Sequence, residues 1–173
     1  MNKLWNTNNY SPEKINRTDD RHGLRLEIDP RVHPFIRREL RIFCRWLRSC
    51  YSFPVRIHVY IPSARRILSR SNELCFGTCF IPEDPNDTVS IDVAGGFQDT
   101  SNLQALQNFT WATIFTLAHE LGHYFQYINQ VTQTPRGAEW QATYYAHQIQ
   151  IEYYTAEWDH MDDGWDTGEK FDS

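Results

Sequence analysis

The pattern His119-Glu120-Leu121-Gly122-His123 combines residue types and a spacing that could do chemistry. On a helix, residues four apart lie one turn above each other, so both imidazoles can point at one metal ion while the glutamate flanks them. This arrangement is typical of zinc hydrolases, in which the glutamate is the general base. Two surface histidines on an ordinary helix would give the same five residues. The surrounding sequence therefore has to decide between these two interpretations.

A third metal ligand is available further along the chain. A catalytic zinc ion takes three protein ligands and keeps one position for water, and a carboxylate is a common third ligand. Polar residues, Pro135 and Gly137 break the first helix after His123, and a second helix is predicted to start near Ala138, so that Glu139 lies in its first turn. Mostly small residues share the predicted helix face of Glu139, and they would allow two helices to approach closely: Ala142, Thr143, Ala146 and Gln150. A surface glutamate that stabilises the helix dipole is the alternative, and it does not explain this small face.

The helix that carries the two histidines is predicted over about residues 110–130. Apolar residues recur there at spacings of three and four, on the side roughly opposite the histidines. These residues are Ile114, Leu117, Leu121, Phe125 and Ile128. The pattern therefore directs the histidines away from the core.

Two blocks of sequence extend this pattern: Phe115-Thr116-Leu117-Ala118-His119-Glu120-Leu121-Gly122-His123 and Glu139-Trp140-Gln141-Ala142-Thr143-Tyr144-Tyr145-Ala146. Together they resemble the ImmA/IrrE family of zinc metallopeptidases, whose signature is an FTLAHELGH-like helix followed by an ExEANxFA-like helix. Gln141 and Thr143 stand where the family usually has an acid and an asparagine. The resemblance covers about residues 72–151 and extends to the first 70 residues only in the coarse order of elements.

The resemblance implies a function and a ligand set. One Zn²⁺ per chain would be held by His119, His123 and Glu139, with Glu120 as the general base of a gluzincin-like endopeptidase. The substrate class that it implies is a regulatory protein such as a phage or mobile-element repressor. Guesses for a further donor to the oxyanion are His147, Tyr144 and Tyr145, with His147 predicted to lie nearest the face of Glu139.

The predicted fold class is α+β, a minimal zincin-like domain with an N-terminal helix, a small three-stranded twisted sheet, the metal helix and the ligand helix. The predicted first helix spans residues 33–49 and the predicted strands span Phe53–Ile61, Leu74–Ile81 and Val89–Val93. Residues 1–28 are polar and predicted to be flexible, residues 29–158 form a single domain, and residues 159–173 are an acidic tail. In zincins generally, the strand just before the metal helix is the sheet edge that binds an extended peptide. Here that strand would be Val89, Ser90, Ile91, Asp92 and Val93.

Composition and charge restrict the class of protein. A chain of 173 residues with 40% hydrophobic content is long enough for one domain with a core. The sequence has neither an 18-residue apolar run nor the apolar region of a signal peptide, so a cytoplasmic protein with no membrane segment is expected. Four cysteines without such a signal indicate free thiols rather than a disulfide framework.

An arginine-rich face of the first helix supports a competing hypothesis. Its members are Arg37, Arg38, Arg41, Arg45 and Arg48, and the formal net charge of the whole chain is -5. A solvated face that pairs with the acidic C-terminal segment is favoured over nucleic-acid binding, because a strand follows the helix in place of a second DNA-binding helix. The alternative function is a zincin-fold binding module with little turnover, which engages a protein or nucleic-acid partner through these arginines. A third possibility is an enzyme whose acidic tail covers this helix or the cleft.

Overall fold

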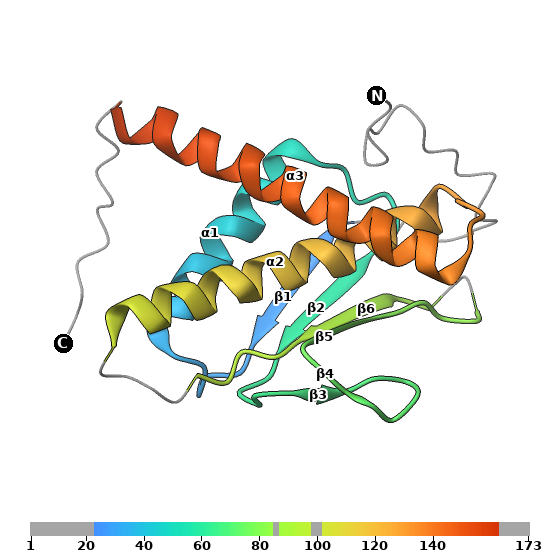
Figure 1. Ribbon diagram of the computed structural model, residues 1–173. Helices are drawn as coiled ribbons and strands as arrows, with labels where there is room; N and C mark the ends of the chain where they lie inside the picture. Colours follow the sequence, from blue (N-terminus) through green and yellow to red (C-terminus); the bar gives the residue numbers. More distant parts are fainter. Residues whose placement is uncertain (1–22, 85–86, 98–101, 163–173) are drawn as a thin grey trace.

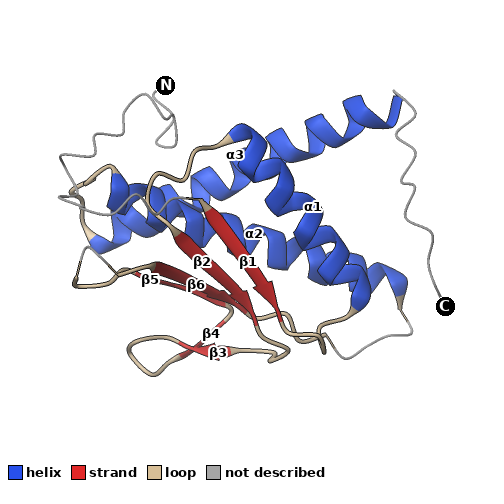
Figure 2. Cartoon of the chain, turned by 180° about the vertical axis from the view of Figure 1, so that it is seen from behind, coloured by secondary structure: helices blue, strands red, loops and turns tan. Residues whose placement is uncertain are grey.

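Three helices cover one face of a small mixed sheet (Figures 1 and 2). The computed structural model describes residues 23–84, 87–97 and 102–162, with side chains up to residue 156. The four-stranded sheet has the order β1-β2-β6-β5, and β3 and β4 form a separate two-stranded sheet. The fold is therefore α+β, as predicted.

The first parallel pair is built from a strand, a helix and a strand. β1 (Leu24–Ile28) pairs in parallel with β2 (Ile57–Ile61), and α1 (Pro34–Cys50) connects them. The buried face of α1 is Ile36, Leu40, Phe43, Cys44 and Leu47. The predicted helix at residues 33–49 is therefore confirmed, whereas the prediction that residues 1–28 are flexible is wrong for β1. Residues 1–22 lie outside the described part of the chain.

The sheet differs from the predicted three strands. β6 (Val89–Val93) pairs in parallel with β2 and antiparallel with β5 (Gly77–Phe80). The single strand predicted at residues 74–81 is divided, because β4 (Leu74–Cys75) pairs instead with β3 (Ile67–Leu68). The prediction that Val89–Val93 is the edge strand is also wrong, because both sides of β6 already pair with neighbours. β5 is the edge strand of the four-stranded sheet on that side.

The two long helices α2 (Leu103–Ile128) and α3 (Pro135–Asp162) pack against each other, and α2 lies between α3 and the sheet (Figure 1). The side chain of Asn102 caps α2 by accepting a hydrogen bond from the backbone N–H of Ala105. Pro135 opens α3, a position where proline loses no helical hydrogen bond. The predicted acidic tail begins inside α3, since the helix runs to Asp162; residues 163–173 are outside the described part.

The core lies between the helices and the sheet. The apolar residues predicted for α2 are all buried: Ile114, Leu117, Leu121, Phe125 and Ile128. All four cysteines are free thiols, as predicted. None of the described helices is long and apolar enough to span a bilayer.

Candidate metal centre

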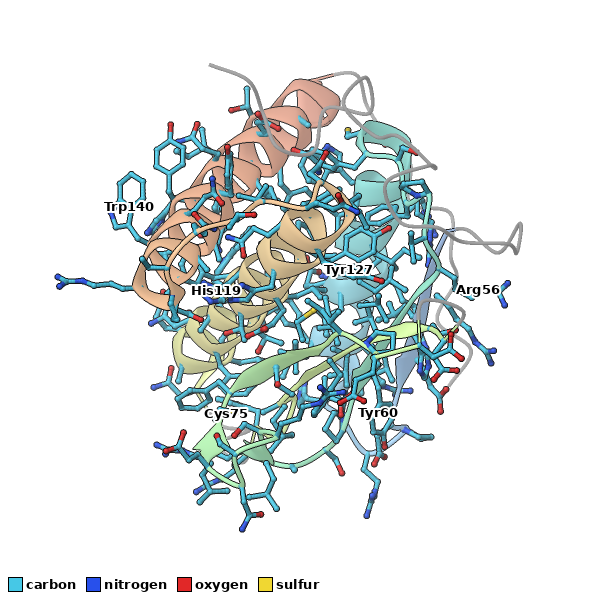
Figure 3. All side chains as sticks on the ribbon, turned by 90° about the vertical axis from the view of Figure 1, so that its right-hand side faces the viewer. Arg56, Tyr60, Cys75, His119, Tyr127 and Trp140 are labelled. Carbon is cyan, nitrogen blue, oxygen red and sulfur yellow. The ribbon has the colours of Figure 1, made fainter. Side chains whose placement is uncertain are left out.

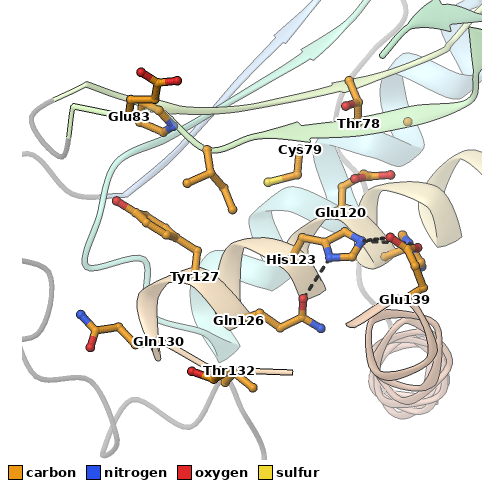
Figure 4. A pocket seen from close by; sticks show the side chains of 15 residues that line it. Thr78, Cys79, Glu83, Glu120, His123, Gln126, Tyr127, Gln130, Thr132 and Glu139 are labelled. Carbon is orange, nitrogen blue, oxygen red and sulfur yellow. Dashed lines mark hydrogen bonds and ion pairs between the residues drawn. The ribbon is translucent and has the colours of Figure 1, made fainter. Parts of the chain in front are cut away.

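The two histidines and the glutamate converge between α2 and α3 (Figures 3 and 4). The Nε2 atoms of His119 and His123 are 3.2 Å apart. The carboxylate of Glu139 lies 3.2 Å from Nε2 of His119 and 3.4 Å from Nε2 of His123. One ligand atom from each residue lies within 4.8 Å of the others. The structure therefore brings together the three predicted ligands as a group that could hold a metal ion.

Each imidazole has a hydrogen-bond partner that fixes its orientation. Nδ1 of His123 is 3.0 Å from Oε1 of Gln126, and the amide group of Gln126 donates to the carbonyl oxygen of Ala138. Nδ1 of His119 is 3.3 Å from the hydroxyl of Thr143. With Nδ1–H donating in both rings, each Nε2 presents its lone pair toward the carboxylate. Partners of this kind fix the tautomer and the ring position of histidine ligands.

The donor set fits a zinc ion. Two neutral imidazoles and a carboxylate are ligands that zinc accepts, and three converging electron-pair donors need a cation between them. Burial, together with the charge of His123, lowers the pKa of His119, although Glu139 opposes this shift. The neutral form of His119, which is the form that binds metals, is therefore favoured.

Glu120 lies beside this group but is not a member of it. It is only 7% exposed, and the backbone N–H of Cys79 donates a hydrogen bond to its carboxylate. Burial and the nearby charge of Glu139 raise the pKa of Glu120 to about 8. A carboxyl group with a pKa in this range is suited to take up and release a proton near neutral pH.

Strand β5 approaches Glu120 closely because residue 77 is a glycine. A Cβ added to Gly77 would lie 2.8 Å from Oε1 of Glu120 and 2.5 Å from Cγ2 of Thr116. Any larger residue would displace one of these side chains. Gly77 and Cys79 thus place the edge strand directly against the candidate base.

A pocket of about 930 Å³ contains the site. Thr78 and Cys79 of β5 line one wall, and His119, His123 and Glu139 line another. The pocket continues past His123 along the last turns of α2 (Figure 4), where its lining is Ile81, Pro82, Glu83, Tyr127, Gln130, Val131 and Thr132. This volume lies in the range that is typical of ligand-binding pockets.

Other predicted site residues lie elsewhere. The guesses for the oxyanion donor, His147, Tyr144 and Tyr145, are not among the described residues that line the pocket. His147 packs against Phe115, and Tyr144 stacks on Trp140. Val89–Val93 is inside the sheet and also outside the pocket lining. The arginines of α1 are absent from the lining too, and four of them are exposed: Arg38, Arg41, Arg45 and Arg48.

Three residues of the site are new relative to the sequence prediction. Gln126 follows His123 by three positions on the same helix, so helical spacing could have identified it. Gly77 and Cys79 gave no comparable signal, because their contact with Glu120 depends on how β5 pairs with β6. Comparison of the chain with protein-family models, curated proteins and solved structures finds no match.

Proposed function

We propose that this protein is a zinc-dependent endopeptidase of the ImmA/IrrE type. The observation that supports this best is the convergence of His119, His123 and Glu139 beside a buried carboxyl group, that of Glu120, at the wall of an open pocket. A structural metal site has four protein ligands and needs no base. Three donors with a carboxyl group next to them are instead what hydrolysis requires.

The metal and the base have separate tasks in this proposal. His119, His123 and Glu139 would hold one Zn²⁺ per chain, and this ion would supply the Lewis acid that activates water and polarises the scissile carbonyl. Glu120 accepts the proton of the attacking water and delivers it to the nitrogen of the leaving amine. Its burial and the donor N–H of Cys79 keep the carboxylate in position while it changes protonation state.

The edge strand β5 is the proposed binding site for the substrate backbone. An extended peptide can add to a sheet edge through main-chain hydrogen bonds, and β5 is both an edge and a wall of the pocket. This assignment replaces the one made from sequence for Val89–Val93. The resemblance of the two sequence blocks points to a regulatory protein, such as a repressor, as the substrate.

The test compares the zinc-loaded wild type with Glu120→Gln on a peptide library prepared from a whole proteome. The amide keeps the shape of the side chain but cannot accept a proton, so new N-termini should form with the wild type and not with the variant. Zinc content and melting temperature of both proteins serve as controls. Equal cleavage by both, or no cleavage by the fully zinc-loaded wild type, would contradict the proposal.

The competing binding-module hypothesis relies on the exposed arginines of α1. It predicts that charge reversal at Arg41 and Arg45 abolishes capture of a partner while Glu120→Gln has no effect. The endopeptidase proposal predicts that Glu120→Gln abolishes substrate turnover and that charge reversal at Arg41 and Arg45 leaves turnover unchanged. Measuring both variants against one substrate protein therefore separates the two functions.

A further inference from the structure

The hairpin formed by β3 and β4 lies beside the edge strand β5, on the side of the sheet that the three helices leave open (Figures 1 and 2). Only Phe76 separates the end of β4 from the start of β5. The backbone carbonyl of Phe76 accepts a hydrogen bond from the N–H of Ala94, so the pairing of β5 with β6 continues by one residue. The proposed substrate strand therefore extends from Phe76 to Phe80.

Two arginines of the hairpin lie over aromatic rings at the two ends of this strand. The Cζ atom of Arg66 is 4.9 Å from the centroid of the Phe76 ring, and that of Arg70 is 5.7 Å from the centroid of Phe80. Both arginines are exposed, and neither forms an ion pair with a residue that the structure describes. Contact with an aromatic ring holds a guanidinium group in place without neutralising its charge. Arg66 and Arg70 therefore present two open positive charges along the substrate strand.

Both arginines lie on the face of β5 that points away from the metal centre. A Cβ added to Gly77 would meet the side chain of Glu120, and the side chain of Cys79 points into the pocket on the same side (Figure 4). Successive residues of a strand point to opposite faces, so Phe76 and Phe80 point the other way. The rings of these two residues, and the guanidinium groups over them, are therefore separated from the catalytic side by the strand itself.

The two sides of the substrate strand differ in charge. On the metal side, the pocket lining includes carboxyl groups such as that of Glu120. On the other side, the hairpin carries Arg66 and Arg70 and one carboxylate, that of Glu73, which accepts a hydrogen bond from the hydroxyl of Ser71. The side chains of a peptide that pairs with β5 also alternate between these two sides. Every second side chain of the peptide would therefore meet positive charge.

We propose that Arg66 and Arg70 select acidic side chains of the substrate, at two positions that lie four residues apart and face away from the metal. The spacing is that of Phe76 and Phe80, which corresponds to about 13 Å at a rise of about 3.3 Å per residue. A planar guanidinium group binds a carboxylate through two parallel hydrogen bonds. This inference rests on the proposed peptidase function and adds the chemical class of the substrate, an extended acidic segment of polypeptide.

The contribution of each arginine should be modest and should appear in substrate binding. Because both guanidinium groups are exposed, each contact should change KM by up to about fivefold. The contacts lie away from the reacting bond and are equally strong in the ground state and in the transition state. Their loss should therefore raise KM and leave kcat unchanged.

The first experiment digests a peptide library from a whole proteome with the zinc-loaded wild type and with the double variant Arg66→Glu/Arg70→Glu. Peptides cleaved by the wild type, aligned at the new N-terminus, should be enriched in Asp and Glu at two positions four residues apart. The double variant should prefer Lys and Arg at the same positions, because its charges are reversed. Melting temperature and zinc content of both proteins verify the fold and the metal centre.

The matched control is Arg25→Glu/Arg56→Glu, which reverses two exposed charges away from β5. Arg25 lies on β1, at the opposite edge of the sheet, and Arg56 projects into solvent (Figure 3). This control should keep the wild-type preference. Cleavage by the wild type without an acidic preference, or an equal preference in Arg66→Glu/Arg70→Glu, would overturn the inference and leave the proposed function standing. Absence of any cleavage by the zinc-loaded wild type would instead contradict the proposed function, and the inference with it.

The second experiment separates the charge of the two arginines from their packing on the rings. One cleaved peptide is synthesised with its two acidic residues and again with alanine at both positions. Arg66→Gln/Arg70→Gln should raise KM for the acidic peptide and leave KM for the alanine peptide unchanged, whereas Arg66→Lys/Arg70→Lys should stay closer to the wild type. An equal rise of KM for both peptides would mean that the arginines only support the hairpin, and this result would overturn the inference.

Discussion

Gly122 of α2 lies directly against Ala142 of α3. A Cβ added to Gly122 would be 2.9 Å from Cα and 3.0 Å from Cβ of Ala142. The two backbones therefore approach more closely than any pair with larger side chains at these positions allows. Gly122 lies between His119 and His123 on α2, and Ala142 lies one turn from Glu139 on α3. The contact therefore sets the distance that the carboxylate of Glu139 must span to reach the histidines.

Replacement of Gly122 by valine should therefore impair the metal centre without changing a ligand. The added methyl groups would force α3 away from α2, which should cost about 1–3 kcal/mol of folding free energy through overpacking. The same displacement should weaken zinc affinity, because Glu139 would move with α3. Melting temperature and zinc titration measure the two effects.

The matched control is Ala112→Val, since Ala112 is an exposed position of the same helix. It adds a β-branched side chain at a position that is open to solvent. A folded Gly122→Val protein with wild-type zinc affinity would show that helix proximity does not position Glu139.

Gln126 should affect zinc binding although it is not a ligand. Gln126→Met keeps the volume of the side chain but removes the oxygen that accepts from Nδ1 of His123. Loss of such an orienting partner typically weakens metal affinity about 10–100-fold. Gln141→Met is the control, because it removes an amide that bonds Gln126 but leaves His123 untouched. Equal effects of the two variants would contradict an orienting role for Gln126.

Asp29 should make the stability of the folded protein depend on pH in the acid range. The side-chain and backbone N–H groups of Arg31 donate to its carboxylate, and the hydroxyl of Ser63 lies 3.1 Å from it. The Arg31 contacts hold the pKa of Asp29 well below its ordinary value. A carboxyl group whose pKa is lowered in the folded state stabilises the protein above its unfolded pKa, near 3.8, and this contribution is lost as the pH falls.

Asp29→Asn should thus melt at a lower temperature than the wild type at pH 7, and the difference should shrink as the pH falls below 4. Arg31 is exposed, so the effect should be small. Melting curves of both proteins between pH 2 and pH 7 test this. If the difference in melting temperature between the wild type and Asp29→Asn grew on acidification, the hydrogen bonds of Asp29 would not favour its charged form.

Local spacing accounts for most of what the sequence could predict here. The ligands on α2 are four residues apart, and the small residues near Glu139 indicated a close helix contact, which the packing of Ala142 against Gly122 confirms. The sequence did not predict β1, because Arg25 and Glu27 alternate with the apolar residues of this five-residue strand and make the segment look like a polar loop. The place of β5 at the sheet edge depends on pairing between distant segments. Local patterns do not encode such pairing, which is why β6 was mistaken for the edge.

The most direct test of the metal centre is the zinc content of the purified protein, measured for the wild type and for His119→Ala, His123→Ala and Glu139→Ala. Thr132→Ala, which changes a pocket residue that is not a ligand, serves as the control. The account predicts about one zinc ion per chain in the wild type and the control, and weakened binding in all three ligand variants, each of which remains folded. Full zinc occupancy in Glu139→Ala, or no zinc binding by the folded wild type, would contradict it.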